Sequence, residues 1–360
     1  MSDINIYRST PRQIRAYIID CIQAGLVPFV KSSPGMGKSS IMASIAQEYG
    51  LKMIDHRLST SSPEDMSGLP EFYQHENGER RARFVPFGDL FPLEGDPLPI
   101  MIVDGKQVEM NGWMLFLDEM NSAKKDMQAP AYKLLLDKMT GQKKLHENCV
   151  ITAAGNLDTD KAIVNTLSTA MQSRIVTLEM ELSHREWLED VALARRWDSR
   201  LVAYLNQYPS KLMDFDPKTN STENTFCCPR TWEFMNKLIQ GKDVTDDKIP
   251  LYAGTITSGV AVDFVRFTKV AAHMVGINEI MNDPVNARIP DDLSAKWSTI
   301  THMMEKITPA NADQLLTYVS RFPVDFRVLF FRAVIVQHPE IHATNSFRQA
   351  MVAMGQYLFS

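Results

Sequence analysis

The sequence predicts an α/β domain with a parallel sheet, followed by an all-helical second part. Apolar runs of strand length at residues 27–30, 113–117 and 149–154 each lead into polar residues or glycine, which is typical of central parallel strands that present polar groups at their carboxyl ends. Segments with helical periodicity separate these runs. From Ser183 onward only helical periodicity remains, so we expect the chain to divide into residues 1–182 and 183–360.

The composition is that of a globular protein without a broadly basic surface. Its 360 residues are 44% hydrophobic and 22% charged, with a formal net charge of -5, so nucleic acid is not the favoured partner on electrostatic grounds. The four cysteines form no CxxC or zinc-type pattern, which predicts reduced thiols. The N-terminus lacks a signal-peptide pattern and no apolar run is long enough to span a bilayer, so we expect a cytoplasmic protein without membrane contact.

The first part contains the elements that a phosphate-binding loop requires. Residues 10–24 predict a helix, residues 27–30 a buried strand, and residues 38–49 a second helix, with a glycine loop between the last two. Residues 51–58 predict another strand and residues 129–138 another helix. Strand, loop and helix therefore follow one another as phosphate binding demands.

Two stretches before residue 111 carry different signals. Residues 59–99 are rich in Ser, Pro, Gly and charge with little periodicity, and predict long functional loops. Asp104-Gly105 lies between alternating apolar residues at 100–103 and 107–110. An Asp-Gly pair in that setting predicts a projecting β-hairpin.

The second part predicts a series of amphipathic helices with a polar loop between two of them. The loop covers residues 211–224. The helices are expected near residues 183–207, 229–240, 257–275, 292–306, 311–319, 324–337 and 344–358.

The glycine loop matches most of the phosphate-loop consensus, which is Gly, four residues, Gly, Lys and then Ser or Thr. Ser32 stands where the first glycine is usual, and a serine fits there only if its φ is not strongly positive. Gly37 would let backbone amides turn around phosphates, Lys38 would supply a positive charge, and Ser39 would place a hydroxyl on magnesium. The alternative is an incidental turn between a strand and a helix. The predicted nucleotide-binding residues are Ser33, Pro34, Gly35, Met36, Gly37, Lys38, Ser39, Ser40 and Asp118.

Two carboxylates and an asparagine follow the other two apolar runs. Asp118 would hold the magnesium shell together with Ser39, and Glu119 would accept a proton from the attacking water. Asn156 would orient that water against the terminal phosphate. The alternatives are a solvated acidic strand end and an asparagine that serves only the turn after Gly155.

Two arginines complete the set of candidate catalytic residues. Arg174 and Arg230 carry a permanent charge on a planar group that suits developing phosphoryl charge. For either arginine taken alone, a surface salt bridge is the stronger explanation. The order along the chain, which is glycine loop, acidic strand end, asparagine strand end and two arginines, favours a single site that hydrolyses ATP.

Six motifs in this order resemble the AAA+ superfamily and, within it, the MoxR-like ATPases. The resemblance covers nearly the whole chain. The motifs are Pro34-Gly35-Met36-Gly37-Lys38-Ser39, Pro63-Glu64-Asp65-Met66-Ser67-Gly68-Leu69-Pro70, Phe116-Leu117-Asp118-Glu119-Met120-Asn121, Ala153-Ala154-Gly155-Asn156, Met171-Gln172-Ser173-Arg174 and Pro229-Arg230-Thr231-Trp232-Glu233.

The resemblance implies a fold, cofactors and partners. The fold is a P-loop α/β core with a β-hairpin insert, followed by an all-α lid and a helical extension. Asn156 matches sensor 1, Arg174 the arginine finger that acts in trans on the neighbouring subunit's ATP, and Arg230 sensor 2 at the start of a lid helix. Such proteins use ATP and Mg²⁺, usually form hexameric rings, remodel protein clients, and often work beside a protein with a von Willebrand factor A domain.

Two other functions stay open at this point. One is a nucleotide-gated scaffold that holds a partner while hardly hydrolysing ATP, and the other is an ATP-dependent nucleic-acid translocase, which would need a basic loop with an aromatic residue. Residues 79–84, Glu-Arg-Arg-Ala-Arg-Phe, are the nearest candidate, although a solvated or intersubunit strand edge is the simpler interpretation. We expect this loop and the Asp104-Gly105 hairpin to contact a protein client, because both lie in the insert between the two nucleotide-binding motifs.

Overall fold

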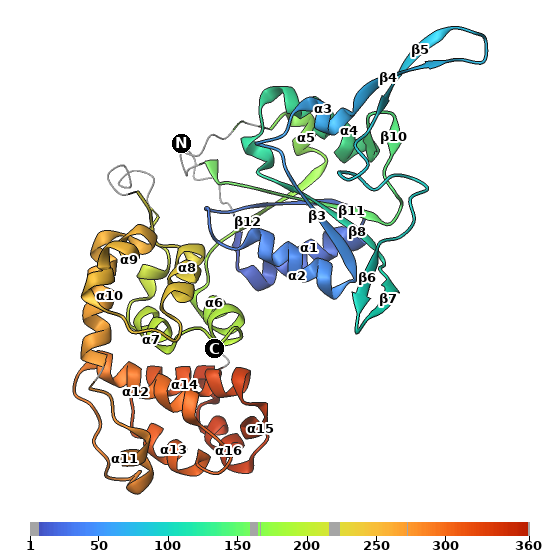
Figure 1. Cartoon of the computed structure of the whole chain (residues 1–360). Helices are drawn as coiled ribbons and strands as arrows, with labels where there is room; N and C mark the ends of the chain where they lie inside the picture. Colours follow the sequence, from blue (N-terminus) through green and yellow to red (C-terminus); the bar gives the residue numbers. More distant parts are fainter. Residues whose placement is uncertain (1–6, 159–164, 166, 216–223, 272, 359–360) are drawn as a thin grey trace. The chain divides into compact units, whose positions relative to one another are not determined.

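A computed structural model describes residues 7–158, 165, 167–215, 224–271 and 273–358 (Figure 1). The chain divides into two compact units, Met1–Leu182 and Ser183–Ser360. The elements of the first unit are β1 Arg8–Ser9, α1 Pro11–Gln23, β2 Val27–Lys31, α2 Lys38–Glu48, β3 Leu51–Arg57, α3 Pro63–Ser67, β4 Leu69–Gln74, β5 Arg80–Val85, β6 Ile100–Val103, β7 Lys106–Glu109, β8 Gly112–Asp118, η1 Met120–Ser122, η2 Lys125–Met127, α4 Gln128–Asp137, β9 Met139–Thr140, β10 Lys143–Lys144, β11 Cys149–Gly155, α5 Thr169–Gln172 and β12 Ile175–Met180.

Six strands of the first unit form one sheet in the order β1-β12-β2-β11-β8-β3. Every pair of neighbours in it is parallel. Ala153 of β11 lies opposite Phe29 of β2 on one side and Leu117 of β8 on the other. The carboxyl ends of these three strands therefore meet at one edge, where ligands of open parallel sheets bind.

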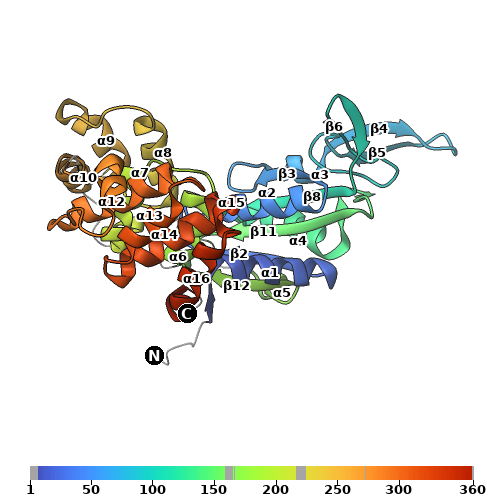
Figure 2. The same cartoon turned by 90° about the horizontal axis from the view of Figure 1, so that it is seen from below.

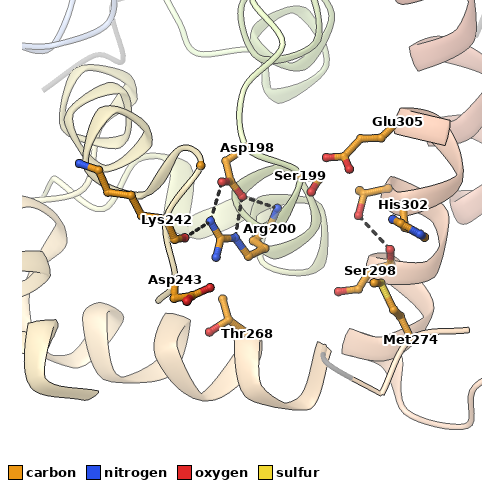
Figure 3. Close-up of a pocket in the computed structure, with 12 residues that line it drawn as sticks. Asp198, Ser199, Arg200, Lys242, Asp243, Thr268, Met274, Ser298, His302 and Glu305 are labelled. Carbon is orange, nitrogen blue, oxygen red and sulfur yellow. Dashed lines mark hydrogen bonds and ion pairs between the residues drawn. The ribbon is translucent and has the colours of Figure 1, made fainter. Parts of the chain in front are cut away.

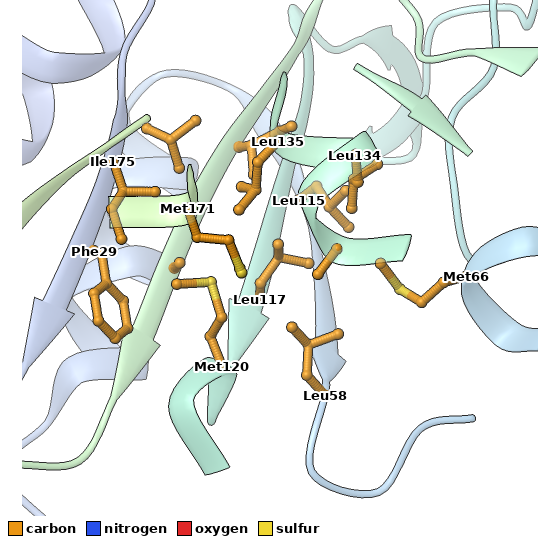
Figure 4. Packing of buried hydrophobic residues seen from close by; sticks show 14 of the residues in the cluster. Phe29, Leu58, Met66, Leu115, Leu117, Met120, Leu134, Leu135, Met171 and Ile175 are labelled. Carbon is orange, nitrogen blue, oxygen red and sulfur yellow. The ribbon is translucent and has the colours of Figure 1, made fainter. Parts of the chain in front are cut away.

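The central strands are buried on both faces, and alternate residues of β8 point to opposite sides. Met114 and Phe116 pack with side chains of α1 and α2, whereas Leu115 and Leu117 pack with α4 and with Met171 of α5 (Figure 4). A strand covered on both faces is apolar at consecutive positions, which explains the continuous run in the sequence.

The predicted hairpin is confirmed, and the prediction of loops throughout residues 59–99 is wrong in part. β6 and β7 are antiparallel around Asp104 and Gly105, whose φ values of 51° and 75° are the positive torsions that a two-residue turn needs. Within residues 59–99 the structure adds the short helix α3 and a second antiparallel ribbon, β4–β5. This ribbon is solvated on both faces, so its sequence lacks the alternation that marks a half-buried strand.

The described part of the second unit is helical. Helices lie in each predicted segment, but residues 183–207 form two α-helices and a π-helix with a break at 194–198 in place of one helix. The helices α9 and α11 were not predicted, and residues 216–223 of the predicted loop lie outside the described residues. None of the described helices is both long and apolar enough to cross a membrane. The elements are α6 His184–Trp187, the π-helix Leu188–Leu193, α7 Ser199–Gln207, η5 Pro209–Leu212, α8 Pro229–Ile239, η6 Asp246–Lys248, α9 Ile249–Ile256, α10 Ser258–Ala271, α11 Ile277–Asn282, α12 Leu293–Lys306, α13 Ala312–Val319, α14 Val324–Gln337, α15 Pro339–His342, α16 Asn345–Ala353 and α17 Gly355–Leu358.

The predicted fold class is confirmed. A parallel sheet flanked by helices carries a β-hairpin insert, and an all-helical unit follows it in the chain.

We predict that Gly68→Ala destabilises the first unit more than Gly78→Ala does. Both glycines have left-handed φ values, 86° and 85°, but a Cβ at Gly68 would lie 2.1 Å from the Val85 carbonyl oxygen, whereas at Gly78 nothing lies within 4 Å. The torsion alone costs roughly 1–2 kcal/mol, and the collision with backbone adds to it. Denaturant unfolding measures both free energies. Equal losses of unfolding free energy in the two variants would show that the backbone at the base of the β4–β5 ribbon moves to accommodate the added methyl group.

Candidate functional site

The glycine loop between β2 and α2 has the backbone that a phosphate cradle needs. Gly35 and Gly37 have φ values of 76° and 91°, and Gly37 is the N-cap residue of α2. The first amides of α2 therefore stay unpaired within the helix and point toward an incoming anion. Ser32 and Ser33 are not among the described non-glycine residues with positive φ, so the serine at the first glycine position introduces no left-handed strain.

Lys38 lies over the beginning of this loop. Its ammonium donates hydrogen bonds to the Ser32 carbonyl oxygen at 3.1 Å, to Ser32 Oγ at 3.1 Å and to the Ser33 carbonyl oxygen at 3.4 Å. Ser32 is fully buried, so its hydroxyl takes part in orienting the lysine. The substitution of serine for glycine thus adds a contact to the loop.

Ser39 and Asp118 come together across the carboxyl edge of the sheet. The Ser39 hydroxyl lies 3.5 Å from Asp118 Oδ2, and Asp118 Oδ1 accepts a hydrogen bond of 2.8 Å from the backbone amide of Glu119. A hydroxyl beside a carboxylate suits Mg²⁺, which takes one or two protein ligands and completes its shell with phosphates and water. Among the described residues no group of three or more His, Cys, Asp or Glu could hold a metal.

Negative charge accumulates at this edge. Burial, and then the nearby charge of Asp118, raise the pKa of the Asp55 carboxyl above its ordinary value, while Arg57 opposes the shift. A second negative charge nearby makes the ionised form of a carboxyl less favourable.

Glu119 is held by a residue that the sequence did not single out. Its φ of 55° is left-handed, a torsion that non-glycine residues adopt at a cost of roughly 1–2 kcal/mol and that is common at functional sites. The Ser59 hydroxyl donates a hydrogen bond to the Glu119 carboxylate. Ser59 follows β3, the neighbour of β8 in the sheet, and a serine after a strand carries no sequence signal that would reveal this contact.

The segment that carries Ser59 is fixed by a buried histidine. His56 Nε2 lies 3.0 Å from the Ser61 hydroxyl, and that hydroxyl donates to the Arg57 carbonyl oxygen at 2.7 Å. Burial lowers the pKa of His56 below its ordinary value, so the ring is neutral near pH 7. The turn after β3 therefore has a defined conformation beside the acidic strand end.

Asn121 fixes the strand end that carries Asn156. The Asn121 side-chain amide donates to the Asn156 carbonyl oxygen at 2.7 Å, and its oxygen accepts from the Asn156 backbone amide at 3.1 Å. A Cβ at Gly155 would lie 2.1 Å from the Asn121 side-chain oxygen. The glycine before Asn156 is thus required by close packing, and Asn121, which lay within a family motif without a role, is a positioning residue.

Arg174 lies at the opposite edge of the sheet from the phosphate loop. It directly precedes β12, whose first residue pairs with Val27 at the start of β2, and the loop begins only after Lys31 at the end of β2. Five residues of strand separate the two, about 16 Å. Arg174 is exposed and makes no ion pair with the described residues; its guanidinium lies 5.4 Å from the Tyr132 ring centroid. Arg174 therefore does not reach the glycine loop of its own chain.

Arg230 belongs to the second unit. It is exposed in the first turn of α8 and has no ion pair among the described residues. Both arginines are thus available to an anion, and the surface salt bridges considered from the sequence are not present in the described chain.

The second unit also contains a polar cavity of about 400 Å³ (Figure 3). Its most buried charges bind each other, since Asp198 and Arg200 are 2.7 Å apart, and Arg200 also donates to the Ile239 and Lys242 carbonyl oxygens at 2.9 Å. These bonds join α7 to the end of α8. The cavity contains none of the predicted site residues.

Comparisons with known proteins give a distant likeness only. No family model matches the chain, and a search of curated proteins finds no relative. Among solved structures, a Cytophaga hutchinsonii protein provisionally described as an ATPase is 12% identical, with 96% of this chain and 88% of that chain covered and a TM-score of 0.35. NtrX of Brucella abortus is 14% identical, with 98% of this chain and 68% of that chain covered and a TM-score of 0.35. A RuvB mutant of Thermotoga maritima is 11% identical, with 83% of this chain and 85% of that chain covered and a TM-score of 0.36. At such scores the likeness says nothing about the site, whose description rests on the geometry above.

We predict that Gly155→Ala and Asn121→Ala are each destabilising but less than additive together. The alanine methyl collides with the Asn121 oxygen, and removing Asn121 leaves backbone groups of Asn156 without partners, at about 1–3 kcal/mol. In the double variant the collision is gone, so denaturant unfolding should give a coupling energy of about 1 kcal/mol. Strict additivity would show that Gly155 serves some other contact.

Proposed function

We propose that this chain is an ATP-hydrolysing AAA+ motor subunit of the MoxR type. In this proposal it works in the cytoplasm, forms a hexameric ring and remodels a protein client together with a von Willebrand factor A domain protein. The observation that carries the ATPase assignment is the meeting of Ser39, Asp118 and Glu119 beside a left-handed glycine loop. The resemblance of the motifs to MoxR-like ATPases supports the finer parts of the proposal.

The residues divide the work according to their chemistry. ATP with Mg²⁺ would supply the phosphoryl group and a cation that neutralises its charge. The loop amides and Lys38 would bind the phosphates, and Ser39 and Asp118 would hold the metal shell. Glu119 would accept the proton of the attacking water and Asn156 would orient that water, while the resemblance assigns Arg230 the role of sensor 2.

Arg174 is assigned to the site of the neighbouring subunit. The strand that separates it from its own phosphate loop supports this assignment, because a side chain cannot reach across about 16 Å of sheet. Its exposure and the lack of an ion pair in the described chain fit a group that acts on another subunit. Hydrolysis at one interface then depends on the position of the next subunit, which is how a ring couples chemistry to movement.

We predict that Glu119→Gln lowers kcat of ATP hydrolysis at least about 100-fold while ATP binding is retained, because an amide cannot accept the proton. The matched control is Glu109→Gln, an exposed position on β7, which should leave kcat unchanged. Steady-state phosphate release and binding of a fluorescent ATP analogue separate the two effects. If wild type and Glu119→Gln are equally inert while the ring assembles, the chain is a nucleotide-gated scaffold instead.

We predict that Arg174→Ala binds ATP almost normally but loses turnover, and that mixing it with Glu119→Gln restores activity. In a mixed ring, an intact Glu119 faces an intact Arg174 at some interfaces. Phosphate release from equal mixtures, compared with each variant alone, measures the recovery. A mixture as inactive as its components would rule out action in trans.

A further inference from the structure

The β4–β5 ribbon has two faces of different chemistry. Leu69 pairs with Val85 and Gln74 with Arg80, and because successive side chains of a strand alternate, the register sorts the residues. We call the face with Pro70, Phe72, Gln74, Arg80, Ala82 and Phe84 the aromatic face. The opposite face carries Leu69, Glu71, Tyr73, Arg81, Arg83 and Val85. Figures 1 and 2 show the ribbon extending away from the sheet of the first unit.

The aromatic face exposes more apolar surface than solubility favours. Phe72 is 63% exposed and Phe84 is 46% exposed, and all residues of β5 are exposed. Both phenylalanines lie on the same face of the ribbon, and contiguous exposed apolar surface marks a place of interaction. Because nearly all of its residues are exposed, the ribbon has no buried core of its own.

The aromatic face also carries an uncompensated cation. Arg81 binds Glu79 at 2.8 Å and Arg83 binds Glu71 at 2.7 Å. Arg80 makes no ion pair with any residue that the structure describes, and its guanidinium lies 4.6 Å from the Phe72 ring centroid. No carboxylate lies on this face. A partner that supplies one anion beside apolar groups would complement it.

We propose that the aromatic face binds an extended segment of the protein client in which alternate side chains are acidic, apolar and apolar. This inference rests on the proposed function for the existence of a client. Arg80, Ala82 and Phe84 follow one another at every second position of β5, with Phe72 opposite Ala82. Alternate side chains of an extended peptide have the same spacing, about 6.6–6.8 Å. The carboxylate binds Arg80, and the two apolar side chains contact Phe72 and Phe84.

Charge favours a peptide over a nucleic acid as the occupant. Residues 69–85 contain Glu71, Glu76 and Glu79 against Arg80, Arg81 and Arg83, so the ribbon has no net charge. A nucleic acid gains its affinity by pairing several phosphates with basic side chains, and here two of the three arginines already bind carboxylates. Arg80, the one arginine of the ribbon without an ion pair among the described residues, therefore suits a peptide that carries one carboxylate.

The test uses fluorescence anisotropy with the full chain and fluorescein-labelled peptides. The acidic probe is Gly-Ser-Asp-Ser-Leu-Ser-Leu-Ser-Gly, and the basic probe has Lys in place of Asp. We expect the wild type to prefer the acidic probe about tenfold, Arg80→Glu to reverse that preference, and Phe72→Ser to weaken both probes. The matched controls on the opposite face are Arg81→Glu and Leu69→Ser, which should keep the wild-type preference.

The following binding results would overturn the inference. Equal binding of both probes would show that the aromatic face does not bind the carboxylate. A reversed probe preference in Arg81→Glu, as in Arg80→Glu, would show the same. Tighter binding of a labelled oligothymidylate than of either peptide would assign the ribbon to nucleic acid. Phosphate release measured in the same variants keeps the two proposals apart: ATPase activity without probe discrimination removes only this inference, and discrimination without ATPase activity removes only the motor function.

Discussion

The parallel register of β2, β11 and β8 is the constraint on which the whole site depends. Because these strands end at one level, the loop after β2, the asparagine after β11 and the carboxylates after β8 share one edge. The apolar side chains on both faces fix this register, since a slip of one residue would turn every side chain to the other face. Buried packing within the sheet thus sets distances of a few ångströms between the polar groups at this edge, such as Ser39 and Asp118.

The parts that could be predicted from the sequence are those whose signal is local. A strand covered on both faces must be apolar throughout, so β8 and β11 were evident. The Asp104-Gly105 turn was evident because few residues accept positive φ. Spacing alone predicted a glycine loop between a strand and a helix, and the torsions explain why Ser32 is compatible with it.

The parts that could not be predicted arise from contacts between distant segments. Ser59 hydrogen-bonds Glu119 at a separation of 60 positions in the sequence, and Asn121 hydrogen-bonds Asn156 at a separation of 35 positions. No local sequence pattern identifies the partner of such a serine or asparagine. The β4–β5 ribbon escaped for another reason: a ribbon solvated on both faces has no hydrophobic pattern to detect. Local signals therefore predicted which polar groups follow the central strands, but not the residues that hydrogen-bond to them.

The turn after β3 connects the acidic strand end to the β4–β5 ribbon along one stretch of backbone. Ser59, which donates a hydrogen bond to the Glu119 carboxylate, is ten positions before Leu69, the first residue of the β4–β5 ribbon. Between them, Ser61 contacts His56 and the short helix α3 braces the chain. Only residues 60–68 therefore separate the ribbon from the hydroxyl that donates to the Glu119 carboxylate, so the ribbon and the acidic strand end share one short covalent connection.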